Sequence, residues 1–337
     1  DSKGLLGEIN SVFEKLDSGI NKLDSRWGAL MPGKNKLSQA DSILTYFSTG
    51  EVLSGQVVLG EDNWLFYKSQ TDADSIGDYE GTNLYSEDEL NSILTSAIIT
   101  QRQIEDKGIR FAIIVAPNKE NVYSEFMPKT YVHAERTRTD ILVDFLQNNG
   151  VNVAYPKEEL LNNSDLQLYF KYDTHWNQLG AYIGVQSVLA QFKIDIPDLK
   201  YRTTSSTTLA DNYRYCGEDD LAKMVGLREV VFNNDLEYKV NGTIDTDWAR
   251  VASDNDQGIA SHFINDEAEI NATVLLVGDS FRTSMLPELQ EVFTDVYVIH
   301  RSAYKSDLID EINPDYIIAE YVERYSSEIE EIDNLVN

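Results

Sequence analysis

The feature that most constrains the fold is an alternation of short apolar runs with helical patterns from about residue 86 to residue 322. The apolar runs have the length and the β-branched and aromatic content of buried strands. They occupy residues 110–117, 151–156, 273–278, 296–300 and 315–322. Because helical patterns lie between them, the chain is predicted to form a three-layer α/β fold, with helices on both faces of a mainly parallel sheet.

Helix boundaries are marked by capping and stop signals. Ser86 and Glu89 have the spacing of a capping box, and Gly108 ends the pattern that they begin. Further helical patterns occupy 136–149, 177–192 and about 280–293, and the β-rich run 166–172 predicts one more strand. These signals fix where strands pass into helices, and in an open parallel sheet functional groups gather at the carboxyl ends of the strands.

Two parts of the chain fall outside this rhythm. Residues 1–50 contain an amphipathic pattern at 4–23 and are predicted to form an N-terminal helical stalk or extension. Residues 51–337 then form the main domain, and 200–262, which are polar and lack periodicity, form an irregular insertion at one edge of its sheet. Since the chain starts at Asp1 without methionine, we expect that a signal peptide or membrane anchor preceded it.

Composition excludes several classes of function. The 337 residues include 57 acidic and 28 basic side chains, a net charge of -29 that disfavours binding of nucleic acid or another polyanion. Cys216 is the single cysteine, so neither an intrachain disulfide nor a cysteine-rich metal site can form. The sequence has no glycine-rich phosphate loop and no convincing metal motif, and we expect no cofactor and no metal.

Ser280 lies in "LLVGDSFRTS", where a strand passes into a helix. A serine in such a turn is either a helix N-cap or a nucleophile whose developing oxyanion the helical N–H groups would face. Asp279 is adjacent in sequence, but it is not the expected acid of a triad. The choice between cap and nucleophile depends on whether a base lies within reach.

His175, in "YDTHWNQLGA", is the candidate base among four histidines, with Asp173 two residues before it. Residues i and i+2 of an extended segment point the same way, so Asp173 can orient the imidazole toward Ser280. The alternative is a surface or core histidine capped by its neighbour. Arg301 ends a strand near the same sheet edge and is either an oxyanion or substrate contact or an ordinary surface arginine.

Together these motifs resemble the alginate O-acetyltransferase family, the AlgJ/AlgX-type enzymes and their Gram-positive DHHW relatives. "YDTHWNQLGA" precedes "VLLVGDSF", the order of a circularly permuted SGNH-hydrolase-like, flavodoxin-like fold. "GEDNWLFYK", "VAPNKENVYSEFMP", "DLAKMVGL" and "VIHRSAY" are similar to further family segments, so that the resemblance covers about residues 55–327.

The resemblance implies roles for individual residues. Ser280 would be the nucleophile, His175 the general base and Asp173 its orienting partner, with the Ser280 N–H and Arg301 stabilising the oxyanion. Tyr123 and Trp176 would contact substrate. Thr174 stands where the Gram-positive signature has histidine, and the usual glycine and asparagine oxyanion blocks are not identifiable.

The resulting hypothesis is an O-acetyltransferase that acts on hydroxyls of an extracellular polysaccharide. The charge of -29 favours a neutral acceptor, such as a cellulose-like glycan, over a polyuronate. The resemblance implies an acetyl donor delivered by a membrane-bound O-acyltransferase, and an extracellular or cell-surface location with a membrane anchor in the full-length protein. The alternatives are a carbohydrate acetyl esterase with the same triad and a non-catalytic glycan-binding subunit of an export complex.

Overall fold

The computed structural model describes residues 34–205, 219–233, 235–241, 250–253 and 260–337. The helix predicted for residues 4–23 lies outside these ranges. The division of the chain at residue 50 stays a prediction, and the first described helix, α2 (Lys34–Thr49), ends just before it.

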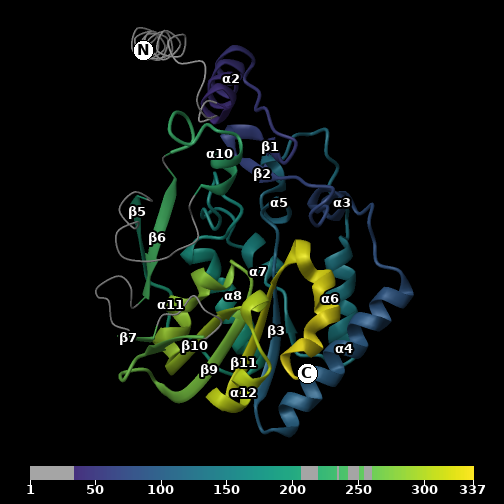
Figure 1. The fold of residues 1–337 in the computed structure, drawn as a ribbon, viewed down its shortest axis with the longest axis vertical. Coiled ribbons are helices and arrows are strands. Elements are labelled where there is room, and N and C mark those ends of the chain that lie inside the picture. Colours follow the sequence, from purple (N-terminus) through teal and green to yellow (C-terminus); the bar gives the residue numbers. More distant parts are fainter. Residues whose placement is uncertain (1–33, 206–218, 234, 242–249, 254–259) are drawn as a thin grey trace, which may run out of the picture.

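A seven-stranded sheet forms the centre of the molecule, as the apolar runs predict (Figure 1). Its order is β4 (Val153–Ala154), β3 (Arg110–Ala116), β11 (Tyr316–Val322), β9 (Ile270–Gly278), β10 (Phe293–His300), β8 (Ser261–Ile264), β7 (Arg250–Ser253). The first five strands are parallel, whereas β8 and β7 extend the edge in antiparallel pairing. The expected mainly parallel sheet is confirmed.

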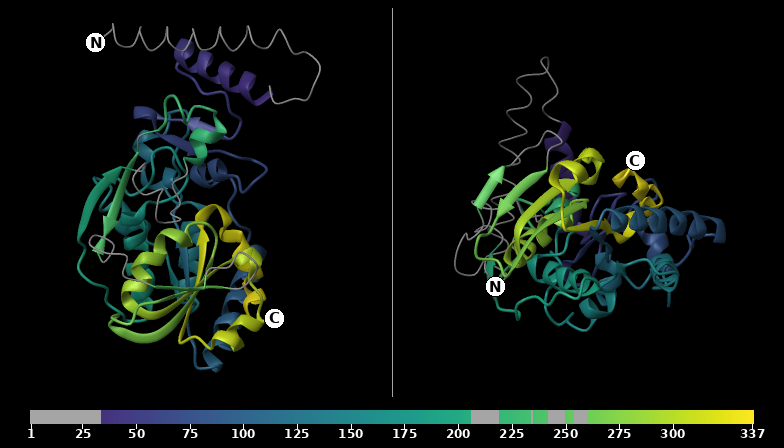
Figure 2. Two further views of the ribbon diagram at one scale, coloured as in Figure 1. Left: turned by 60° about the vertical axis from the view of Figure 1, so that its left-hand side comes forward. Right: turned by 90° about the horizontal axis from the view of Figure 1, so that it is seen from below.

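Helices cover both faces of the sheet because the side chains of each strand alternate between two cores (Figure 2). On β3, Ala112 and Ile114 face one core, whereas Phe111 and Ile113 face the other. The first core is covered by α8 (Gln178–Gln191) and α11 (Arg282–Val292). The second is covered by α4 (Glu87–Asp106), α6 (Arg138–Asn148), α12 (Asp307–Ile312) and η5 (Glu323–Leu335).

The predicted helix signals are confirmed. Ser86 and Glu89 form the capping box that begins α4, and Thr137 forms a second one with Asp140 at α6. Gly108 follows α4 with a φ of 82°, a conformation that residues with a side chain rarely adopt. The chain can therefore turn directly from α4 into the buried strand β3.

A smaller layer lies over the carboxyl ends of the parallel strands (Figures 1 and 2). Its β-hairpin, β1 (Val57–Leu59) with β2 (Leu65–Tyr67), packs on α10 (Asp220–Met224) through a third apolar cluster. The remaining short elements of this part of the chain are η1 (Glu61–Asn63), α3 (Ser75–Glu80), α5 (Lys119–Val122), η2 (Ser124–Phe126), α7 (Lys157–Leu161) and η4 (Arg301–Ala303).

Residues 200–262 are more regular than their composition indicates. They contain the antiparallel pair β5 (Tyr201–Ser205) and β6 (Leu236–Val240), helix α10, and the edge strand β7. The pair β8–β7 extends the sheet at one edge, where the insertion was expected. Side chains of this segment reach the loop that carries His175, a contact that its polar composition did not reveal.

Candidate active site

Ser280 lies in the turn between β9 and α11, at the centre of the sheet's carboxyl edge. Gly278, just before it, lies so close to β11 that an added Cβ would come within 2.4 Å of Glu320 Oε2 and 2.7 Å of its Cβ. Only glycine allows this approach without displacing Glu320, and the approach brings the serine turn directly against β11.

Asp279 anchors the serine turn. Its carboxylate accepts hydrogen bonds from the main-chain N–H of Phe281 at 2.9 Å and of Val322 at 2.8 Å, while its own N–H donates to Glu320. Burial, followed by the charge of Asp279, raises the pKa of Glu320 well above its ordinary value. Asp279 therefore fixes the position of Ser280 rather than orienting the base.

His175 lies in a loop, not at the end of a strand. The prediction of a strand at residues 166–172 is wrong: the structure has only an isolated bridge between Tyr169 and Trp176 there. The loop's carbonyls instead accept hydrogen bonds from Lys119 Nζ, at 2.6 Å for Asp173, and two of its N–H groups donate to Asp235. These side chains, with one main-chain bond from Leu65 N to the carbonyl of Lys171, satisfy backbone groups that a neighbouring strand would otherwise bind.

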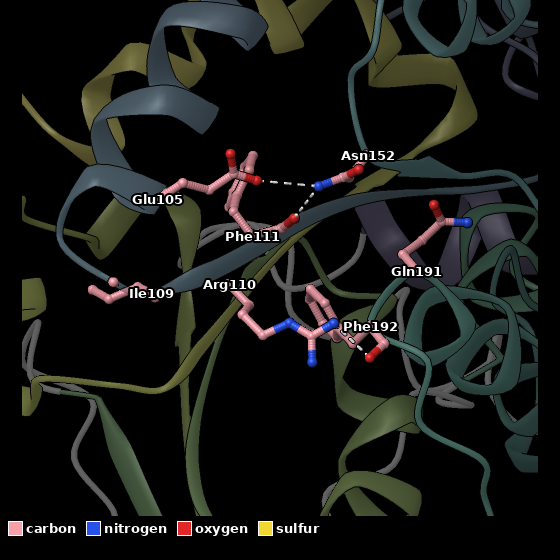
Figure 3. Close-up of a pocket in the computed structure, with 8 residues that line it drawn as sticks. Glu105, Ile109, Arg110, Phe111, Asn152, Gln191 and Phe192 are labelled. Atoms are coloured by element: carbon pink, nitrogen blue, oxygen red, sulfur yellow. Dashed lines mark hydrogen bonds between the residues drawn. The ribbon is translucent and has the colours of Figure 1, made fainter.

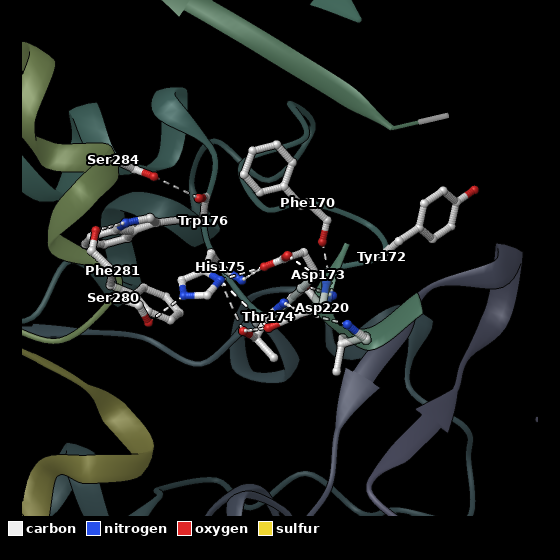
Figure 4. Close-up of polar contacts among 12 residues, drawn as sticks. Phe170, Tyr172, Asp173, Thr174, His175, Trp176, Asp220, Ser280, Phe281 and Ser284 are labelled. Atoms are coloured by element: carbon white, nitrogen blue, oxygen red, sulfur yellow. Dashed lines mark hydrogen bonds and ion pairs between the residues drawn. The ribbon is translucent and has the colours of Figure 1, made fainter. Parts of the chain in front are cut away.

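Ser280, His175 and Asp173 form one continuous chain of hydrogen bonds (Figure 4). His175 Nε2 is 2.6 Å from Ser280 Oγ, and Nδ1 is 2.6 Å from Asp173 Oδ1. Asp173 is buried, and its position on the far side of the imidazole fixes the proton on Nδ1. The unprotonated Nε2 can then accept the serine proton.

The electrostatics of the pair suit a general base. Burial alone would raise the pKa of Asp173, but the charge and hydrogen bond of His175 outweigh it and lower that pKa to about 2. Burial would lower the pKa of His175, but the charge and hydrogen bond of Asp173 raise it above its ordinary value. A basic imidazole beside a permanently ionised carboxylate accepts a proton readily.

Asp220, the first residue of α10, lies beside this pair and was not among the predicted site residues. Its carboxylate accepts from Thr174 Oγ1 at 2.6 Å and from Thr174 N at 2.8 Å, and its own N–H donates to Asp173 Oδ2 at 2.9 Å. The one sequence signal was the family-like segment "DLAKMVGL", which begins at this residue.

Arg324 is a second group that the sequence did not single out. It follows β11, is buried, and its guanidinium carbon lies 5.4 Å from the centre of the Phe281 ring. It lines a small polar cavity with Thr174 and Asn118, and its charge acts to lower the pKa of His175. A fixed cation therefore stands beside the triad.

The other predicted contacts occupy different positions. Arg301 pairs with Glu328 at 2.6 Å and lies over the rings of Tyr321 and Tyr325. It lines a cavity of about 390 Å³ together with Glu320 and Tyr321, and neither Ser280 nor His175 lines this cavity.

Tyr123 and Trp176 are buried in the first core. The Tyr123 hydroxyl donates to the carbonyl of Leu166, and the Trp176 indole donates to the carbonyl of Phe281. Neither ring exposes a face to solvent, so each holds the polypeptide around the triad in place. The resemblance implied substrate contacts for both, and their burial favours a structural role instead.

A separate cavity of about 350 Å³ lies at the amino end of β3, lined by residues that include Glu105, Arg110 and Asn152 (Figure 3). Ser280 lies at the other end of the strands, at their carboxyl ends.

Asp173, His175 and Asp220 are the one group of potential metal ligands that the described residues bring within 4.8 Å of one another. Both nitrogens of His175 are, however, already hydrogen-bonded within the triad. Within the described ranges no helix is long and apolar enough to span a membrane.

The sequence matches a family model described as the SGNH hydrolase-like domain of acetyltransferase AlgX over residues 57–306. No curated protein sequence matches the chain.

Solved structures that share the fold include the following three. Bacillus cereus PatB1, solved with a sulfonyl adduct, has a TM-score of 0.55 and 15% identity, over 83% of this chain and 96% of its own. A DHHW family protein from Eubacterium siraeum has a TM-score of 0.54 and 14% identity, over 84% and 99%. The O-acetyltransferase domain of Pseudomonas putida AlgJ has a TM-score of 0.50 and 16% identity, over 81% and 92%.

Proposed function

Because the chain belongs to the family of SGNH hydrolase-like domains of acetyltransferase AlgX, we propose that it transfers acetyl groups to sugar hydroxyls through Ser280. The observation that carries this proposal is the unbroken chain from Ser280 Oγ through His175 to Asp173, with both hydrogen bonds at 2.6 Å. A nucleophile, a base and an orienting acid in this order are the requirement for acyl transfer by a serine.

In the first half-reaction, Ser280 Oγ attacks the carbonyl carbon of an acetyl ester while His175 Nε2 takes the serine proton. When the tetrahedral intermediate collapses, the bond to the donor oxygen breaks and His175 returns the proton to that leaving oxygen. The product is an acetyl ester on Ser280.

In the second half-reaction, a sugar hydroxyl takes the place of Ser280. His175 removes the hydroxyl proton as the sugar oxygen attacks the acetyl carbon, and the proton then passes to Ser280 Oγ as its ester bond breaks. Asp173 stays ionised throughout, since its low pKa keeps it as the partner of the imidazolium that forms in each step.

We assign stabilisation of the oxyanion to the Ser280 N–H and to Arg324. Arg324 thus has the role that the resemblance implied for Arg301. Arg324 is buried beside Phe281 and Thr174, whereas Arg301 is already paired with Glu328. A buried cation that needs no reorganisation is most effective where negative charge develops.

A neutral glycan is the acceptor that the charge supports best. The chain carries a net charge of -29, and Asp220 places one of its carboxylates beside the triad. A polyuronate would be repelled by this field. We propose a hydroxyl-rich neutral polysaccharide, such as a cellulose-like glycan, with the protein acting outside the cell beside a membrane-bound O-acyltransferase that supplies acetyl groups.

The test is incubation with p-nitrophenyl acetate and a series of neutral and uronate oligosaccharides, comparing the wild-type chain with Ser280→Ala. Acetylated neutral sugar that depends on Ser280 is the expected product. Release of acetate alone would identify an acetyl esterase, which uses the same triad with water as acceptor. If Ser280→Ala changed neither product, the remaining candidate would be a glycan-binding subunit of an export complex.

A further inference from the structure

We propose that Asp220 is a positioning residue that acts on the catalytic base through its carboxylate: Thr174 holds this carboxylate beside His175, next to the main-chain N–H that orients Asp173. The inference rests on the proposed function only for the identity of the base. It assigns to α10, a short helix of the 200–262 segment, a direct part in the chemistry.

The first observation is a main-chain contact. Asp220 N donates to Asp173 Oδ2 at 2.9 Å, while Asp173 Oδ1 accepts from His175 Nδ1 and from His175 N. Each carboxylate oxygen of Asp173 therefore has its own donors. Because Asp220 occupies Oδ2, Asp173 cannot rotate without breaking two sets of hydrogen bonds, and Oδ1 stays directed at the imidazole.

The second observation is the position of the Asp220 carboxylate. Thr174 donates to it twice, from Oγ1 to Oδ2 at 2.6 Å and from N to Oδ1 at 2.8 Å. This clamp leaves Oδ2 at 3.9 Å from His175 Nδ1. The carboxylate is thus too far for a hydrogen bond but close enough to act on the charge of the imidazole.

The charged groups around His175 come from its own loop and from three other elements. Asp173 belongs to its own loop and Asp220 to α10, and both favour the protonated imidazole; Arg324, from η5, opposes it. Lys119, from α5, lies behind Asp173 and binds the Asp173 carbonyl. Ser280, Phe281 and the Thr174 hydroxyl, which lies 3.3 Å from His175 Nδ1, also contact the imidazole and carry no charge.

This arrangement stabilises the imidazolium that forms when His175 takes the serine proton. The imidazolium then lies between Ser280 and two carboxylates, one hydrogen-bonded and one at longer range. A base whose protonated form is stabilised is a stronger base, and the stabilisation is present before the reaction starts. Burial and the charge of Asp173 raise the pKa of Asp220 itself, as expected for two carboxylates that share one cation.

The proposal is tested on the full chain by NMR titration of the imidazoles, which number four and are resolved with isotope-labelled histidine. His175→Gln identifies the His175 signal. Asp220→Asn keeps one of the two acceptor oxygens for Thr174 and removes the charge, and Asp220→Ser removes the charge with a smaller side chain. We expect the pKa of His175 to fall by about 0.5 to 1 unit in either variant, because the carboxylate is partly exposed and screened.

Asp235→Asn is the matched control. Asp235 also comes from the 200–262 segment and also holds the His175 loop, through the N–H groups of Lys171 and Tyr172, but it makes no contact with the imidazole. A loss of loop order alone would act in all three variants. We therefore expect the His175 titration to move in the Asp220 variants and to stay in place in Asp235→Asn.

The same variants are assayed by the pH dependence of kcat/KM for p-nitrophenyl acetate. The reaction needs neutral His175, so a lower pKa moves the acid limb to lower pH, while kcat on the plateau falls about tenfold. An unchanged His175 pKa in folded Asp220→Asn or Asp220→Ser overturns the proposal. Because the titration requires no turnover, it decides this point even if the protein proves not to be an acetyltransferase.

Discussion

The two loops that meet at the active site are built in different ways. The Ser280 turn continues β9, whose two neighbours in the sheet are β11 and β10, so regular backbone pairing holds it. The His175 loop has one isolated bridge and single main-chain hydrogen bonds from Leu65 and Ala222. Side chains add further bonds: Lys119 from α5, and Asp235 and Asp220 from the 200–262 segment. One half of the site is therefore fixed by regular sheet pairing, whereas the other depends on a few buried charges.

This difference predicts that the two halves fail in different ways. A substitution that distorts the backbone of the Ser280 turn also displaces β9. We therefore expect it to lower the free energy of unfolding, with a modest loss of activity. Damage to the His175 loop removes its few hydrogen bonds, and it will lower activity more than the change in fold would indicate.

The largest effect is expected where the catalytic side chain of either half is removed. Ser280→Ala and His175→Ala should each lower kcat/KM for p-nitrophenyl acetate by about 10³- to 10⁴-fold, and the double variant by no more than either single one, because the two residues act as a unit. Thermal unfolding of the three variants checks that the fold is kept. Additive losses would show that the two loops do not form one catalytic unit.

Lys119→Met tests the side-chain clamp. The variant leaves the carbonyls of Phe170 and Asp173 without their donor, so we expect about 100-fold lower kcat and about 2 kcal/mol lower stability. Lys129, which is exposed, provides the control as Lys129→Met. Activity close to that of the wild type in Lys119→Met would mean that the loop holds its shape without the buried ammonium.

Gly278→Ala tests the sheet-built half. The new methyl group would collide with Glu320, and the strain should lower stability by about 1 to 3 kcal/mol and kcat by about tenfold. Gly55→Ala is the control, since a Cβ there would meet nothing within 4 Å. Denaturant unfolding and kcat are measured for both. A stable but inactive Gly278→Ala would reverse the contrast between the halves.

The smallest effect concerns the buried acid of each half, whose contributions to stability should depend on pH in opposite directions. The pKa of Asp173 is lowered from 3.8 to about 2, so its contribution is present above pH 3.8 and is lost as pH falls toward 2. The pKa of Glu320 is raised from 4.5, mainly by burial, so its contribution is present below pH 4.5 and declines as pH rises above it.

Unfolding of Asp173→Asn and Glu320→Gln across pH 2.5 to 7 measures this contrast. Relative to the wild type, Asp173→Asn should become less stable as pH rises through the range and Glu320→Gln more stable. If the free energy of unfolding changed with pH in the same direction in both variants, the two loops would not differ in their electrostatics.

What the sequence could predict follows the same division. The strands, the helix caps and the turn at Ser280 follow from local periodicity and turn chemistry, and the structure has them close to where these signals lie. The Asp-x-His spacing correctly brought Asp173 to His175, because the contact is between near neighbours.

The parts that could not be predicted depend on side chains that meet only after folding. Residues 166–172 have the composition of a strand. Their backbone groups instead bind side chains: the Lys171 carbonyl accepts from Lys119, and the Tyr172 N–H donates to Asp235. Arg324 and Asp220 are far in sequence from Ser280 and His175, and no periodicity marks them. Arg301 was expected to contact the oxyanion because it follows a strand end, but its guanidinium forms an ion pair with Glu328.

The most direct test of the account is capture of the acyl-enzyme. The chain is mixed with p-nitrophenyl acetate without acceptor, quenched in acid, digested and mapped by mass spectrometry, beside Ser280→Ala and His175→Ala. We predict one acetyl group on Ser280 in the wild type, removed when an acceptor oligosaccharide is added before the quench, and little or none in either variant. Turnover with no acetyl group on Ser280, or the same acetylation in Ser280→Ala, would contradict the assignment of Ser280 as the nucleophile.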